Sequence, residues 1–174
     1  MQWQERASLT SNPGLEHMKK FLKAVRLDNA DDELYKQGGA CDENEWVCSG
    51  GFAVCNLAAG YRCEPRCYCD ASFLSISSRA RATLAEVVEV EDGDIEIFKD
   101  SLTQHLLFDW KAPDYATARG LAEEEINYTV ALCETFSAEV WITVKRSPNT
   151  QSSEGTINEQ YDQYQRLQIG AHSL

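Results

Sequence analysis

Six cysteines close together in the first half of the chain are the residues with the clearest chemical potential. With one more cysteine far downstream, the set is Cys41, Cys48, Cys55, Cys63, Cys67, Cys69 and Cys133. Clustered sulfur serves either disulfide bonds in an oxidising compartment or thiolate ligation of a metal in a reducing one. The cysteines are therefore the first candidate site.

The spacing of the cysteines favours disulfides over zinc. Zinc sites usually present two cysteines separated by two or four residues, whereas here the intervals are six, six, seven, three and one residues. Because seven is an odd number, one thiol stays unpaired, and the pattern does not say which. Cys133 is either a small buried apolar residue in a strand or a long-range staple to the cluster. Zinc remains the cofactor expected if the cysteines are reduced, and otherwise none is expected.

His105 is the other residue of catalytic type inside the chain. With Asp109 four residues further on, it could form an acid–base pair for hydrolysis of a phosphodiester or a glycosidic bond. The chain lacks the motifs of serine hydrolases, phosphate loops, dinucleotide sites and zinc proteases. A half-buried strand histidine explains His105 more simply, so no catalytic residue is assigned.

The charge of the chain restricts its partners. Its net charge is -12 over 174 residues, which repels a phosphate backbone, so nucleic acid is not an expected partner. No run of eighteen apolar residues is present, so no transmembrane helix is expected. Residues 1–11 are polar and show no signal segment, which fits either a cytosolic protein or the mature form of a secreted one.

Four basic residues gather near the beginning of the chain. Apolar residues recur at helical spacing after Asn12-Pro13 and predict a helix over residues 13–27. Its other face carries Lys19, Lys20, Lys23 and Arg26. This face either packs towards the acidic residues that follow it or forms a membrane-surface or partner-binding face.

A set of acidic residues surrounds a turn signal in the middle of the chain. Residues 87–98 alternate between apolar and acidic side chains around Asp92-Gly93, which predicts a two-residue β-hairpin. The hairpin would oppose like charges, Glu89 with Glu96 and Glu91 with Asp94, which destabilises a ladder. Solvent and nearby basic residues relieve the repulsion, or else a basic partner surface or a bound cation such as Ca²⁺ does so.

The remaining patterns predict an α+β fold. Further strands are expected over residues 102–110, 126–133 and 140–146, with a helix over 113–125 and a polar helix near 157–167. Together they predict an antiparallel sheet of about four to six strands packed with one or two helices, and a cysteine-stapled N-terminal half.

The expected domain organisation has three parts. A polar arm, residues 1–12, precedes a single α+β domain over residues 13–146. That domain contains the cysteine-rich segment 41–69 and the sheet 84–146. Residues 147–174 form a polar, mobile tail.

These features favour a small secreted, disulfide-stabilised protein that binds another macromolecule, as effectors, toxins and inhibitors do. In size and composition the chain resembles secreted cysteine-rich virulence proteins. A protein partner is expected at the two charged sets, the acidic Glu89, Glu91, Asp92, Asp94 and Glu96 and the basic Lys19, Lys20, Lys23 and Arg26. The chain is expected to be a monomer, or a dimer through the odd cysteine. If it is secreted, Asn127 is a potential glycosylation site.

Two other functions stay open. One is an intracellular, cytoplasmic interaction module that folds around zinc through the clustered cysteines. The other is a small hydrolase that uses His105.

Overall fold

The computed structural model describes residues 18–36, 38–50, 71–148 and 160–166. Its strands are β1 (Lys19–Ala24), β2 (Trp46–Cys48), β3 (Phe73–Ser75), β4 (Arg81–Ala82), β5 (Ala85–Val90), β6 (Trp141–Pro148) and β7 (Gln160–Arg166). Its helices are α1 (Ala30–Leu34), α3 (Asp92–Phe108) and α4 (Tyr115–Glu134).

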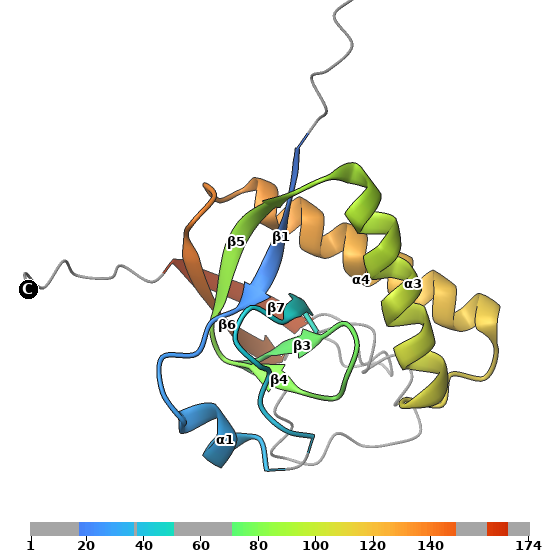
Figure 1. Ribbon diagram of the computed structural model, residues 1–174, viewed down its shortest axis with the longest axis horizontal. Helices are drawn as coiled ribbons and strands as arrows, with labels where there is room; N and C mark the ends of the chain where they lie inside the picture. The colour runs from blue at the N-terminus through green and yellow to red at the C-terminus, as the bar shows by residue number, and fades with distance from the viewer. Residues whose placement is uncertain (1–17, 37, 51–70, 149–159, 167–174) are drawn as a thin grey trace, which may run out of the picture.

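The strands form one antiparallel sheet in the order β4-β3-β2-β1-β5-β6-β7. Helices α3 and α4 pack against each other beside β1 (Figure 1), and the end of α4 reaches the other face of this strand. The predicted α+β class with an antiparallel sheet is therefore confirmed. The described part of the chain contains seven strands, more than the four to six expected.

The residues expected to form the first helix contain the central strand instead. β1 lies between β2 and β5, and its adjacent residues Phe21 and Leu22 are both 0% exposed because they point to opposite, covered faces. A strand covered on both faces shows a continuous apolar run rather than alternation. The helix predicted over 13–27 is therefore wrong in its described part.

The acidic residues around position 92 begin a helix and do not form a hairpin. β5 ends at Val90, and Glu91 is the N-cap of α3. Glu91 and Asp94 form a capping box, in which the Asp94 carboxylate accepts a hydrogen bond from the Glu91 amide at 3.2 Å. Carboxylates are favourable here because the first amides of a helix are unpaired and its N-terminus is positive. The predicted opposition of like charges across a ladder therefore does not occur.

Two other expected strands are helical. α3 includes residues 102–108 of the segment expected as a strand at 102–110, and α4 runs on through 126–133 as far as Glu134. Asp114 begins α4 by accepting a hydrogen bond from the Thr117 amide at 2.7 Å. Buried residues three and four apart define the inner faces, Ile95, Phe98, Leu102 and Leu106 in α3 and Ala118, Ala122, Ile126, Thr129 and Cys133 in α4. None of the described helices is long and apolar enough to cross a membrane.

The end of the chain adds a strand to the sheet. The strand expected over 140–146 is confirmed as β6. A polar helix was expected near 157–167, but residues 160–166 form β7, which pairs antiparallel with β6 from Ile142↔Arg166 to Pro148↔Gln160. Pairing with a neighbouring strand outweighs the weak local preference of this polar sequence.

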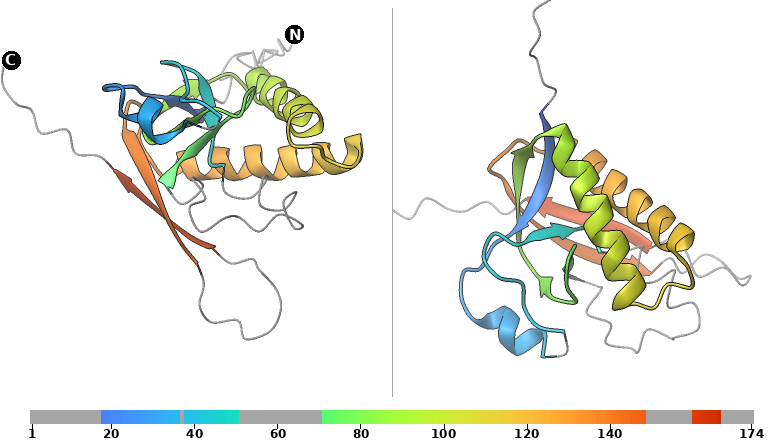
Figure 2. Two further views of the ribbon diagram at one scale, coloured as in Figure 1. Left: turned by 90° about the horizontal axis from the view of Figure 1, so that it is seen from below. Right: turned by 45° about the vertical axis from the view of Figure 1, so that its right-hand side comes forward.

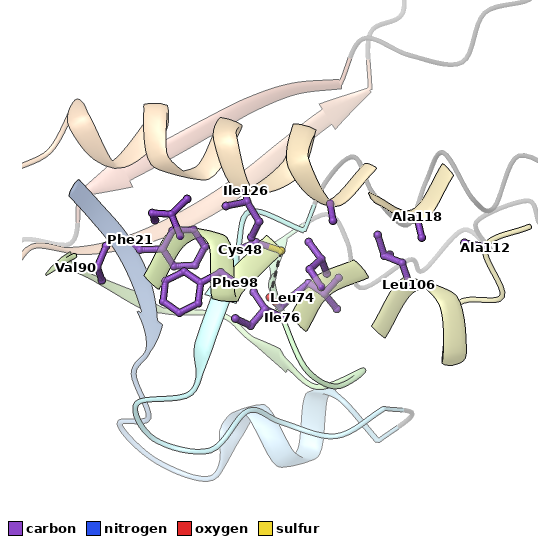
Figure 3. Close-up of a cluster of buried hydrophobic side chains, with 13 residues drawn as sticks. Phe21, Cys48, Leu74, Ile76, Val90, Phe98, Leu106, Ala112, Ala118 and Ile126 are labelled. Carbon is purple, nitrogen blue, oxygen red and sulfur yellow. Dashed lines mark hydrogen bonds between the residues drawn. The ribbon is translucent and has the colours of Figure 1, made fainter. Parts of the chain in front are cut away.

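Two apolar clusters hold the sheet. Between the sheet and the helices, the centroids of the Phe21 and Phe98 rings lie 4.7 Å apart (Figure 3). The centroid of the Trp46 ring also lies 4.7 Å from that of Phe98. The second cluster lies on the other face of β1 and includes Leu22, Val47, Phe73, Val87, Ile142 and, from the last turn of α4, Cys133. β1 contributes to both clusters.

Removal of the Phe21 ring should lower stability strongly. We expect Phe21→Ala to reduce the free energy of unfolding by about 3–5 kcal/mol, because the ring is buried and a cavity would remain. Phe108→Ala is the control, since Phe108 is 67% exposed and should change stability by about 0.5 kcal/mol or less. Urea unfolding followed by circular dichroism measures both, and equal losses would contradict this description of the core.

Candidate functional site

The two charged sets singled out in the sequence lie beside each other. Lys19 and Lys20 do not share a helical face as predicted. They are adjacent in the strand β1, so their side chains point to opposite faces of the sheet. Lys19 Nζ lies 3.3 Å from Asp92 Oδ1 at the beginning of α3, and Lys20 stands opposite Glu89 in the β1–β5 ladder. Lys20 Nζ also donates a hydrogen bond to the Phe136 carbonyl at 2.9 Å, just past the end of α4.

The other members of these sets also have partners within the molecule. Lys23 Nζ lies 4.5 Å from the centroid of the Trp46 ring, and Arg26 forms an ion pair with Asp32. Glu96 accepts hydrogen bonds from Lys99 at 2.7 Å and from Arg119 at 3.0 Å. Among the described residues, one ion pair, Lys19–Asp92, thus joins the two sets, and most of their other members have partners elsewhere in the fold.

The three cysteines in the described part of the chain are buried and form no disulfide. These are Cys41, Cys48 and Cys133, so the disulfide staple is not supported at these positions. Cys133 is indeed a small buried residue, but it lies in α4 and not in a strand. The Cys48 thiol donates a hydrogen bond to the Leu74 carbonyl at 3.5 Å (Figure 3). Cys55, Cys63, Cys67 and Cys69 lie outside the described residues.

Burial makes two of these thiols unreactive. It raises the pKa of Cys41 strongly, and it raises the pKa of Cys133 to about 12, with the Glu134 charge adding to the effect. A thiol must lose its proton to attack an electrophile or to bind a metal. Cys41 and Cys133 therefore act as small apolar side chains. The described residues contain no group of three or more side chains able to hold a metal ion.

A buried carboxylate fixes the two residues that follow β2. Glu125, 0% exposed on α4, accepts hydrogen bonds from the Ser49 hydroxyl and from the Gly50 amide, the latter at 2.8 Å. The Ser49 amide in turn donates to Thr129 Oγ1 at 3.0 Å. A buried carboxylate is tolerated when hydrogen bonds replace its water. Sequence reasoning missed Glu125, because its burial depends on α4 continuing past residue 125.

His105 is buried and held in one protonation state. Its side chain is 1% exposed, and Trp110 Nε1 donates a hydrogen bond to His105 Nε2 at 3.0 Å. The proton of the neutral ring is therefore on Nδ1, a buried atom that has no hydrogen-bond partner among the described residues. Burial lowers the pKa of His105 to about 4, against the opposing effect of the Asp109 carboxylate.

A shallow hollow of about 340 Å³ lies over His105. Ser77, Ser101, Gln104, His105, Phe108 and Asp109 line it. Ser77 comes from the connection between β3 and β4, and the next four come from α3. The right-hand view of Figure 2 shows α3 in front of the sheet. Phe108 is 67% exposed, and Ile97 on the same helical face is 62% exposed.

The hollow brings together a serine, a histidine and an aspartate, but not in a catalytic arrangement. Ser101, His105 and Asp109 are four residues apart on α3. The Ser101 hydroxyl donates to the Ile76 carbonyl at 3.5 Å, and His105 Nε2 is occupied by Trp110. A general base needs an available nitrogen within reach of the proton that it removes. The geometry therefore favours a structural role for His105.

Sequence reasoning found His105 and Asp109 but missed Phe108, Gln104 and Ser77. The signal was present, because Ile97, Ser101, Gln104 and Phe108 follow helical spacing. This helical spacing was missed because residues 102–110 were predicted to form a strand.

The molecule is therefore an α+β protein in which an antiparallel sheet packs with the two long helices α3 and α4. A partly apolar hollow lies on the exposed side of α3. The chain belongs to a family of unknown function (DUF6505), whose model matches residues 18–172. No curated protein and no solved structure matches the chain significantly.

His105 should make the folded state sensitive to mild acid. A histidine in the unfolded chain takes up its proton near pH 6.5, whereas folded His105 does so near pH 4. Its contribution to stability is therefore complete above about pH 6.5 and falls by about 3 kcal/mol as the pH decreases towards 4. His105→Gln should remove this part of the pH dependence in urea unfolding between pH 7 and pH 4.5. An NMR titration that gave His105 a midpoint near 6.5 would contradict the proposed environment.

The three buried thiols should be shielded from reagents and not joined in disulfides. In the native protein without reductant, iodoacetamide should leave Cys41, Cys48 and Cys133 unmodified, because the thiols are buried and those of Cys41 and Cys133 are also protonated. After denaturation without reductant, all three should be alkylated, as peptide mass spectrometry can show. A disulfide at any of the three would contradict the structure.

Proposed function

We propose that this protein acts by binding another protein, and that the hollow beside Phe108 is the contact site. The observation that carries the proposal is the exposure of an aromatic ring next to a hollow lined by polar groups. Aromatic side chains at the edge of a pocket often contribute much of the binding energy in protein interfaces. Ile97 extends the apolar surface along the same face of α3.

The hollow suits a basic side chain of the partner. The Asp109 carboxylate is 47% exposed, and His105, 3.7 Å from it, is neutral at pH 7, while the guanidinium of Arg79 donates to the Asp109 main-chain carbonyl and not to its carboxylate. A guanidinium or ammonium group could pair with Asp109 while lying over the Phe108 ring. The net charge of -12 would speed the approach of a basic partner.

The extracellular, effector-like role stays part of this proposal and rests on the clustering of cysteines in the sequence. The buried thiols Cys41, Cys48 and Cys133 lend it no support. The four other cysteines are an even number and can still pair or bind zinc. Intact mass separates the possibilities: two disulfides lower it by about 4 mass units, and one zinc ion raises the native mass by about 65. If these four cysteines are free thiols and the native protein contains no metal, both the disulfide and the zinc alternatives are excluded.

Loss of the Phe108 ring should weaken binding of a basic peptide. We expect Phe108→Ser to raise the dissociation constant of a short peptide containing arginine and tryptophan about tenfold, because a central aromatic contact is lost. Leu27→Ser is the matched control, since Leu27 is 66% exposed in the connection from β1 to α1, away from α3 (Figure 1). Amide chemical shifts from an NMR titration give both the affinity and the location.

The expected shifts are confined to the second half of α3 and to the neighbourhood of Ser77. Equal effects of the two substitutions, or shifts centred on the acidic beginning of α3, would exclude the hollow as the contact site. No binding by the wild-type protein would exclude a basic partner.

A further inference from the structure

β6 and β7 form a two-stranded ribbon that extends beyond the rest of the sheet. β5 pairs with β6 only at Ala85↔Ile142 and Glu86↔Trp141, whereas β7 pairs with β6 as far as Pro148. The left-hand view of Figure 2 shows the ribbon running away from the helices. An isolated pair of strands is only marginally stable in water, so the ribbon would benefit from a further partner.

The two edges of the sheet differ in how they are protected. At one edge, β4 has only two residues, and Arg81 is bridged to Ala40. At the other, β7 has seven residues, QYDQYQR, with no proline, glycine or lysine. Short strands, prolines and lysines are the usual means of preventing edge pairing. Among the described strands, none pairs with the outer side of β7.

We propose that β7 is a homodimerisation edge, at which the β7 strands of two copies pair antiparallel about a two-fold axis through Tyr164. The partner is a second copy because the charges of this strand are self-complementary. In this register, Asp162 of one copy stands opposite Arg166 of the other, and the pair occurs twice. Within one chain, Arg146 already stands opposite Asp162. Charges therefore alternate across three neighbouring strands, which stabilises cross-strand pairing.

This interface is separate from the hollow on α3 and does not depend on the proposed function. It also differs from a dimer formed through an odd cysteine, because it needs no disulfide. Main-chain hydrogen bonds between edge strands would hold it, as in other cases of strand addition.

Sedimentation equilibrium of the full chain in the presence of a reducing agent tests the proposal. The wild-type protein should show a concentration-dependent mass approaching twice the chain mass of 19.6 kDa. Arg166→Asp should weaken dimerisation about tenfold or more, because it replaces two attractive pairs with two repulsive ones. Arg166→Lys keeps the charge and should dimerise like the wild type.

Lys145→Asp is the matched control. It changes the net charge of the ribbon by the same amount as Arg166→Asp. Lys145, however, stands opposite Gln163 and lies outside the row in which Arg146, Asp162 and the second copy's Arg166 alternate in charge. Its dimerisation should therefore match that of the wild type, as should that of Phe108→Ser. A wild-type monomer at all concentrations would overturn the proposal. Equal weakening by Arg166→Asp and Lys145→Asp would overturn the proposed register, and circular dichroism checks that each variant is folded.

Discussion

The burial of β1 on both faces is the constraint on which the rest of the structure depends. Phe21 packs against α3, while its neighbour Leu22 belongs to the cluster on the other side of the sheet. The two lysines that precede them reach the ends of the two long helices, Lys19 at the beginning of α3 and Lys20 just past the end of α4. One strand of six residues thus sets the position of both helices relative to the sheet.

The position of α3 in turn creates the hollow. Its capping box fixes where the helix begins, directly after β5, and its apolar face fixes its rotation about its own axis. That rotation buries His105 and leaves Ile97 and Phe108 in solvent. The Trp110 hydrogen bond then holds the histidine ring in place. The surface proposed for binding is therefore a consequence of core packing on the opposite side of the same helix.

Buried polar groups in this molecule serve positioning more than reactivity. Glu125 holds the residues that follow β2, and His105 joins the end of α3 to Trp110. Hydrogen bonds offset the cost of burying such groups. The buried thiols Cys41 and Cys133 are likewise protonated and packed among apolar side chains. This explains why residue types that suggested chemistry in the sequence have structural roles in the described part of the fold.

The sequence by itself determined the α+β class, the antiparallel sheet, strand β6 and the beginning of α4, because these depend on local periodicity and on a local N-cap at Asp114. It also revealed the charged sets and His105. The tertiary structure alone decided that residues 19–24 form a strand and residues 92–108 a helix. A strand covered on both faces loses its alternation, and the acidic residues 91–94 suit a helix N-terminus as well as a turn. Only the packing of distant segments around β1 distinguishes these alternatives.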